Sequence, residues 1–167
     1  YAQKSYDKYI QEFLKYSDES WSGREERAIE YALDKVRREF DQGWQGIEYK
    51  LNTVGSSRGD YPFVTVTLGL GTGRFEKMAS ISLLEVHKGG QGKKGRKKPV
   101  LFPKIVFLYD ENIHGKGKIS EDVFEAGVDC SAKTTYPHWP SMSGKGYISS
   151  RYKQSANVSS PMGSSAF

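Results

Sequence analysis

The first third of the chain carries a helical pattern of apolar side chains. From residue 24 to about residue 54, apolar residues recur at spacings of three and four, which places them on one stripe of a single long helix: Ala28, Tyr31, Ala32, Val36, Phe40, Trp44, Ile47 and Leu51. A shorter helix before it is indicated by a second set at similar spacing: Tyr6, Ile10, Phe13 and Leu14. Gly43 and Gly46 interrupt the long stripe, and each either costs about 1 kcal/mol relative to Ala or lets a neighbouring backbone approach closely.

Two short apolar segments alternate with helical ones in the middle of the chain. The Phe, Val and Thr content of residues 62–68 predicts a strand, and the nearly all-apolar residues 100–109 predict a second strand that is buried on both faces. Pro103 predicts a bulge or a missing ladder hydrogen bond there. Helices are expected over residues 74–87 and from 120 to about 134. This alternation predicts an α/β fold with parallel strands joined by right-handed crossovers.

Two strands are too few to close an α/β sheet or barrel, so we expect the other strands to come from outside this chain of 167 residues or from its tail. From residue 141 onward Ser, Gly, Lys and Tyr dominate, and no packing element is evident at the end. The pattern therefore predicts a single partial domain. It consists of a helical lead-in (1–40), helices and strands (41–140) and a Ser/Gly-rich segment (141–167).

Composition narrows the class of protein only slightly. The chain has 25 Lys and Arg against 20 Asp and Glu, a net charge of +5 that permits a polyanionic ligand without requiring nucleic acid. The single cysteine, Cys130, excludes an intrachain disulfide and a thiolate-rich zinc site, and its helical context favours a packed small residue. No apolar stretch is long enough to span a membrane and no signal peptide opens the chain, so a cytoplasmic location is expected.

The clearest candidate for ligand binding is the segment 88–98, here called the basic loop. It holds six cationic side chains and four glycines, with no acidic residue. Glycine frees backbone amides to approach an oxyanion and the cations supply charge, so phosphate is the expected ligand, bound by Lys93, Lys94, Arg96, Lys97 and Lys98. The spacing does not match a nucleotide-binding P-loop, and a solvated surface loop is the alternative interpretation.

Other chemistry is not indicated by the residues alone. The histidines are scattered without metal-ligand spacing, so no metal site is predicted. No serine lies in the Gly-x-Ser-x-Gly pattern of a nucleophile elbow.

Five short motifs, taken together, resemble the central part of the anaerobic (class III) ribonucleoside-triphosphate reductases. The match covers residues 41–167, and the order and spacing of the motifs carry the resemblance. The motifs are residues 45–53 with 57–59 and 62–63, residues 69–72, residues 101–107, residues 130–133 with 136–137, and the closing Ser-Pro-Met-Gly of residues 160–163.

The resemblance implies a fragment of a ten-stranded α/β barrel of the glycyl-radical-enzyme type, in an enzyme that is usually a homodimer. Such an enzyme reduces ribonucleoside triphosphates for deoxyribonucleotide biosynthesis and DNA replication. A radical stored on a C-terminal glycine passes to a cysteine on a loop inside the barrel, and the thiyl radical takes hydrogen from the ribose 3′ carbon. Formate or a small redox protein supplies the reducing equivalents. The expected partners are the ribonucleoside triphosphate, the remaining reductase segments and a radical-SAM activating enzyme.

This segment itself is expected to bind no cofactor. In the family the glycyl radical is installed by an activase that uses SAM and an iron–sulfur cluster. That radical, a structural zinc and the nucleotide effectors would all belong to parts outside this chain.

The family's active-site loop reads Met-Gly-Cys-Arg, whereas this chain reads Met162-Gly163-Ser164-Ser165. Ser164 therefore takes the position of the radical cysteine. Because an O–H bond is much stronger than an S–H bond, serine cannot carry the relay radical, and we expect this chain as written to be inactive. An engineered change, a degenerate copy and an interrupted gene are all consistent with the serine.

The remaining substrate-binding candidates are Asn52, Ser57 and Arg58, in a turn between a helix and a strand, with Met162 and Gly163 in the loop. A capped turn that only holds the strand is the alternative for the first three. Two other functions also fit the residues: a nucleotide- or nucleic-acid-binding module that uses the basic loop, and a regulatory paralogue that has kept the barrel core and lost the chemistry.

Overall fold

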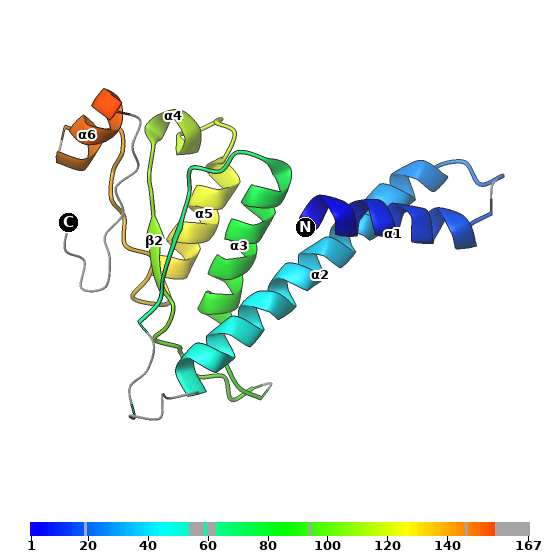
Figure 1. The fold of residues 1–167 in the computed structure, drawn as a ribbon, viewed down its shortest axis with the longest axis horizontal. Coiled ribbons are helices and arrows are strands. Elements are labelled where there is room, and N and C mark those ends of the chain that lie inside the picture. The colour runs from blue at the N-terminus through cyan, green and yellow to red at the C-terminus, as the bar shows by residue number, and fades with distance from the viewer. Residues whose placement is uncertain (19, 54–58, 60–62, 94, 146, 156–167) are drawn as a thin grey trace.

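A helical arm extends from a small α/β unit (Figure 1). The computed structural model describes residues 1–18, 20–53, 59, 63–93, 95–145 and 147–155. The arm is formed by α1 (Ala2–Tyr16), which packs along the first part of α2 (Arg24–Thr53). The second part of α2 packs against α3 (Arg74–Gly89) in the α/β unit. All three helices were predicted from the apolar spacing. No helix in these ranges is long and apolar enough to cross a lipid bilayer.

The two predicted strands form and pair in parallel, as the order of elements indicated. β1 (Thr65–Leu68) lies beside β2 (Lys104–Phe107), with Thr65 opposite Lys104 and Leu68 opposite Phe107. Each strand is shorter than predicted, and β2 begins directly after Pro103, whose ring nitrogen cannot donate to the ladder. The Phe102–Pro103 peptide bond is cis.

An extended segment runs along the other side of β2. His138 and Ser141 form parallel bridges with Val106 and Tyr109, and the Phe107 amide donates to the His138 carbonyl oxygen at 2.8 Å. The chain itself thus supplies a third parallel stretch of backbone beside the two strands.

Alternate residues of β2 serve two separate cores, which confirms the predicted burial on both faces. Ile105 and Phe107 pack with buried residues of α3 and of α5 (Glu121–Ser131), namely Leu83, Leu84, Val123 and Cys130. Val106 and Leu108 face the opposite way and pack with Met142, as does the partly buried Tyr152 of α6 (Tyr147–Ser155). The short helices α4 (Glu111–His114) and α6 were not predicted, because neither carries an apolar stripe.

Glycines in two of the helices have opposite surroundings. A Cβ built on Gly43 or Gly46 of α2 meets nothing within 4 Å, so neither glycine permits a close backbone approach. A Cβ on Gly127 of α5 would lie 2.7 Å from Cη2 of Trp139 and 3.2 Å from the Phe107 ring. Gly127 is therefore the position at which the helix requires a missing side chain.

The contrast between these glycines gives a matched pair of variants. We expect Gly127→Ala to lower the free energy of unfolding by about 1–3 kcal/mol, because the added methyl overpacks the contact with Trp139. Gly43→Ala should raise it by up to about 1 kcal/mol, because Ala is the better helix former and the site is open. Urea unfolding followed by circular dichroism measures both. Equal effects of the two variants would contradict this packing.

Candidate functional site

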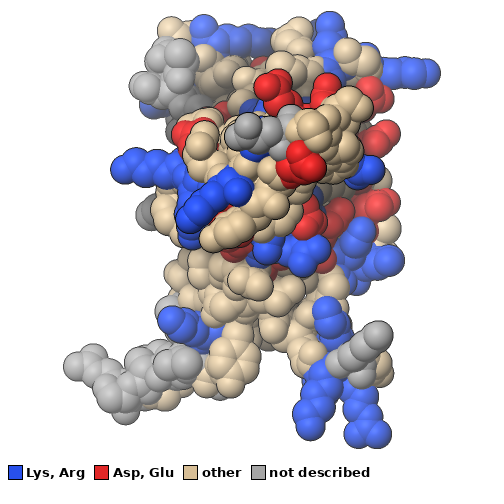
Figure 2. Space-filling model, turned by 90° about the vertical axis from the view of Figure 1, so that its right-hand side faces the viewer, with Lys and Arg blue, Asp and Glu red and all other residues tan. Residues whose placement is uncertain are grey.

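The candidate residues that the structure describes gather at the end of the α/β unit where β1 and β2 begin. Asn52 lies in the last turn of α2, and the basic loop connects the end of α3 to the segment that leads into β2. Figure 2 shows lysine and arginine side chains projecting from this lower end of the molecule. Six positions named from the sequence lie outside the described residues: Ser57, Arg58, Lys94, Met162, Gly163 and Ser164.

Asn52 fastens the end of α2 to the backbone just before β2. Its Nδ2 donates to the carbonyl oxygens of Glu48 (2.7 Å) and Phe102 (2.6 Å). Its Oδ1 accepts from the amides of Leu101 (3.0 Å) and Phe102 (3.2 Å). Both amide hydrogens and both lone pairs of the side chain are thereby used. These hydrogen bonds support the structural interpretation, in which the turn holds the strand in place. Contact between Asn52 and substrate stays a prediction.

The basic loop folds as a hairpin. Gln91 and Lys98 pair in antiparallel fashion, with amide-to-carbonyl distances of 2.9 and 2.8 Å. The turn into it needs glycine at position 90, where φ is 66° and a Cβ would lie 2.4 Å from the Lys98 carbonyl oxygen. The side chains of Lys93, Arg96 and the two lysines that follow are exposed. Four of the cations predicted from composition therefore project from a hydrogen-bonded turn.

A buried polar contact lies beneath the basic loop. Oε1 of Glu48 and Nδ1 of His87 are 2.8 Å apart, and both side chains have no exposed surface. Oε2 of Glu48 accepts from Nε2 of Gln91 at 3.3 Å, and the Gln45 carbonyl lies at the same distance from that nitrogen. The contact thus ties α2, α3 and the basic loop together. Sequence reasoning missed it, because nothing in the spacing pairs residues that lie so far apart along the chain.

His87 and Cys130 are not placed for nucleophilic catalysis. Both side chains are fully buried. Burial raises the pKa of the Cys130 thiol; the Thr134 hydroxyl, 3.5 Å from Sγ, and Lys88 oppose this shift, while Glu48 adds to it. A thiol with a raised pKa is a poor nucleophile at neutral pH. The interpretation of Cys130 as a packed small residue agrees with this environment.

The opposite end of the strands is organised around His114. Its Nε2 donates to the carbonyl oxygen of Gly69 at 2.8 Å, and its Nδ1 lies 3.0 Å from the backbone nitrogen of Asp110. The imidazole therefore joins the chain after β1 to the chain after β2. Within the described ranges, no three His, Cys, Asp or Glu side chains come together in a way that would hold a metal ion.

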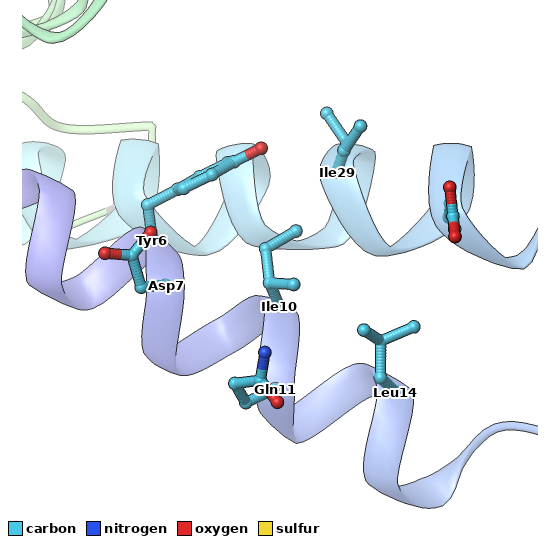
Figure 3. A pocket seen from close by; sticks show the side chains of 7 residues that line it. Tyr6, Asp7, Ile10, Gln11, Leu14 and Ile29 are labelled. Carbon is cyan, nitrogen blue, oxygen red and sulfur yellow. The ribbon is translucent and has the colours of Figure 1, made fainter.

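A shallow groove on the arm is separate from these residues. Tyr6, Ile10 and Leu14 of α1 lie in a row beside Ile29 of α2 (Figure 3). The groove has a volume of about 420 Å³ and is rimmed by polar and acidic side chains, Asp7, Gln11 and Glu25. Its lining includes no cation and no nucleophile, so it adds nothing to the predicted chemistry.

Comparison with known proteins identifies the family. The family described as anaerobic ribonucleoside-triphosphate reductase matches residues 1–167. The reductase of Enterobacteria phage T4 is 31% identical over 138 residues, which cover 82% of this chain and 21% of that protein. The reductase of Escherichia coli (strain K12) is 33% identical over 108 residues, or 64% of this chain and 15% of that protein. The Haemophilus influenzae reductase is 31% identical over 138 residues, or 82% and 18%.

The architecture is that of an α/β protein, with parallel backbone segments covered by helices. Within that class, the chain belongs to the anaerobic ribonucleoside-triphosphate reductase family, which confirms the resemblance and extends it to residues 1–40. The chain spans about a fifth or less of the length of the relatives described above.

The contacts of Asn52 predict a large effect on stability. Asn52→Ala removes the hydrogen bonds to Leu101 and Phe102, and we expect the free energy of unfolding to fall by about 1–3 kcal/mol. Asn112→Ala is the control, because its exposed side chain makes one hydrogen bond, to Asp110, and it should change stability by no more than about 0.5 kcal/mol. Unchanged stability for Asn52→Ala together with a raised Kd for nucleotide would instead assign the side chain to the substrate.

The environment of Cys130 predicts a protected thiol. Alkylation by iodoacetamide at pH 8 should be at least about tenfold slower in the native protein than in urea, because burial blocks access and the raised pKa lowers the thiolate fraction. Moving the cysteine to the exposed neighbouring position, in the double variant Cys130→Ala/Ala132→Cys, should abolish the protection. Equal rates for the two native proteins, measured by mass spectrometry, would show that Cys130 is accessible.

Proposed function

We propose that this chain is a segment of a class III ribonucleoside-triphosphate reductase, in which it forms part of the wall of a ten-stranded glycyl-radical-enzyme barrel and leads into the active-site loop. The observation that carries the proposal is the family match from the first residue to the last. The parallel pairing of β1 and β2 supports it, because a barrel of this type is built from such pairs.

The two faces of β2 support the assignment of inside and outside. In α/β barrels the helices lie outside and the opposite face of each strand points inward. α3 and α5 cover the face of Ile105 and Phe107, so the face of Val106 and Leu108 would be the inner one. Met142 and Tyr152 of the following segment pack on that inner face. In the proposed barrel, α6 would therefore lie on the interior side of the wall.

The reaction proposed for the complete enzyme replaces the ribose 2′ hydroxyl by hydrogen and releases water. The two electrons come from formate, which is oxidised to carbon dioxide, or from a small redox protein. A cysteine thiyl radical removes hydrogen from the ribose 3′ carbon and later returns it. The glycyl radical, when installed by the radical-SAM activating enzyme, supplies the oxidising equivalent that forms this thiyl. The zinc site, the effector sites and the second subunit of a homodimer would lie in other parts of the reductase.

Serine at position 164 is decisive for activity under this proposal. The hydroxyl would have to lose a hydrogen atom from a much stronger bond than the thiol, so the relay would stop before it reached the substrate. The chain as written would bind and shape the site but would not support turnover.

Exchanging the serine tests the proposal directly. In the complete reductase, charged with its activating enzyme under anaerobic conditions, we expect Ser164→Cys to gain formate-dependent formation of deoxyribonucleotide. Ser165→Cys is the matched control and should stay inactive, because the thiol would be one residue away from the relay position. Nucleotide binding without turnover by Ser164→Cys would indicate a regulatory paralogue. Turnover by the unchanged protein would refute the role given to position 164.

A further inference from the structure

We propose that the basic loop, with Tyr49 on the turn of α2 that contacts Gln91, binds the backbone and a base of a single-stranded nucleic acid. This function lies beyond nucleotide reduction and does not depend on it. The observations behind it are the free cations, the ordered hairpin that presents them, the small volume beside it and the exposed aromatic ring on the neighbouring turn of α2.

The cations of the basic loop are available to a ligand. The exposed side chains of Lys93, Arg96, Lys97 and Lys98 take part in none of the ion pairs found among the described residues. Lys88, at the start of the loop, differs because its Nζ lies 3.6 Å from a carboxylate oxygen of Asp129. Lys97 lines a small cavity together with Asp41 and Glu85, but no ion pair among the described residues joins it to either carboxylate. The four positive charges therefore still form a local field that attracts phosphate groups.

The hairpin holds these charges in place. Its two backbone hydrogen bonds fix Gln91 opposite Lys98. The side chain of Gln91 is in turn fixed by Glu48, which is itself buried against His87. Less backbone freedom is therefore lost on binding than in an unanchored loop.

The volume beside the hairpin favours a polymer over a single nucleotide. The adjoining cavity has a volume of about 190 Å³, whereas sites for small ligands usually have roughly 300–1,000 Å³. Asp41 and Glu85 line that cavity with Lys97, and their two negative charges outweigh its one positive charge and oppose a triphosphate. An extended chain of phosphates can instead follow the exposed cations on the outside of the turn.

Tyr49 favours a single strand over a duplex. Its side chain is 59% exposed, and it belongs to the same turn of α2 as Gln45 and Glu48, the two residues that contact Gln91. An exposed ring on the helical turn that contacts a cationic hairpin is an arrangement on which unpaired bases can stack. The bases of a duplex are stacked within the helix and do not offer a face to such a ring.

Charge variants test the electrostatic part of the proposal in the complete protein. The probe is a fluorescein-labelled oligothymidylate of about 20 nucleotides, followed by anisotropy between about 50 and 200 mM KCl. Lys97→Gln/Lys98→Gln should reduce the slope of log K against log salt by about 1.4, because two phosphate contacts are lost at about 0.7 each. Lys116→Gln/Lys118→Gln removes the same charge from exposed lysines after α4 and should leave the slope unchanged.

A second variant tests stacking without altering charge. Tyr49→Ala should weaken binding about fivefold or more with no change in slope. Tyr16→Ala, at a ring on the arm that is 79% exposed, should have no effect. The proposal is overturned by a complete protein that does not bind the probe, by equal slope changes in the two lysine pairs, or by an unlabelled duplex that competes as well as the single strand.

Discussion

The contact between Glu48 and His87 is the constraint on which the arrangement of this segment depends. A carboxylate and an imidazole that are both closed off from water are unfavourable unless each finds a hydrogen-bond partner, so α2 and α3 are held at the register that brings Oε1 to Nδ1. The second oxygen of Glu48 then fixes Gln91 at the root of the basic loop. One turn further along α2, Asn52 fixes the backbone that enters β2. A single helix face thereby fixes the connection from α3 to β2 near both of its ends.

The helices and the parallel pairing of β1 and β2 could be predicted from the sequence, because apolar spacing and element order determine them locally. The lengths of the two strands could not be predicted. Only four residues of each strand are paired. β2 cannot begin before Lys104, because Pro103 has no backbone N–H to donate, and the pairing with β1 ends at Phe107. The helix α6 was not predicted because its sequence is polar, and its position on the face of β2 opposite α3 and α5 depends on the packing of Met142 and Tyr152 there.

The candidate site could likewise be predicted only in part. The cations of the basic loop are visible in the composition, and five collinear motifs sufficed to find the family. The hairpin geometry depends on Gly90 meeting the carbonyl of Lys98, and the holding contacts of Asn52 depend on a segment fifty residues away. The first is a short-range contact in a hairpin whose turn has no recognisable sequence motif, and the second is a tertiary contact for which a single sequence has no signal. From the sequence alone, an asparagine before a strand is equally consistent with binding a ligand and with holding the backbone, and only its hydrogen-bond partners distinguish the two.

The continuity of α2 through both parts of the molecule gives the segment a mechanical property. Thirty residues of unbroken helix form a rod about 45 Å long. Its outer half lies in the arm with α1, and its inner half carries Glu48 and Asn52 (Figure 1). A tilt of about 5° around the inner end would displace the outer end by about 4 Å over a rod of this length. A partner that binds the arm and tilts α2 would therefore also act on the backbone that enters β2, which Asn52 holds to this helix.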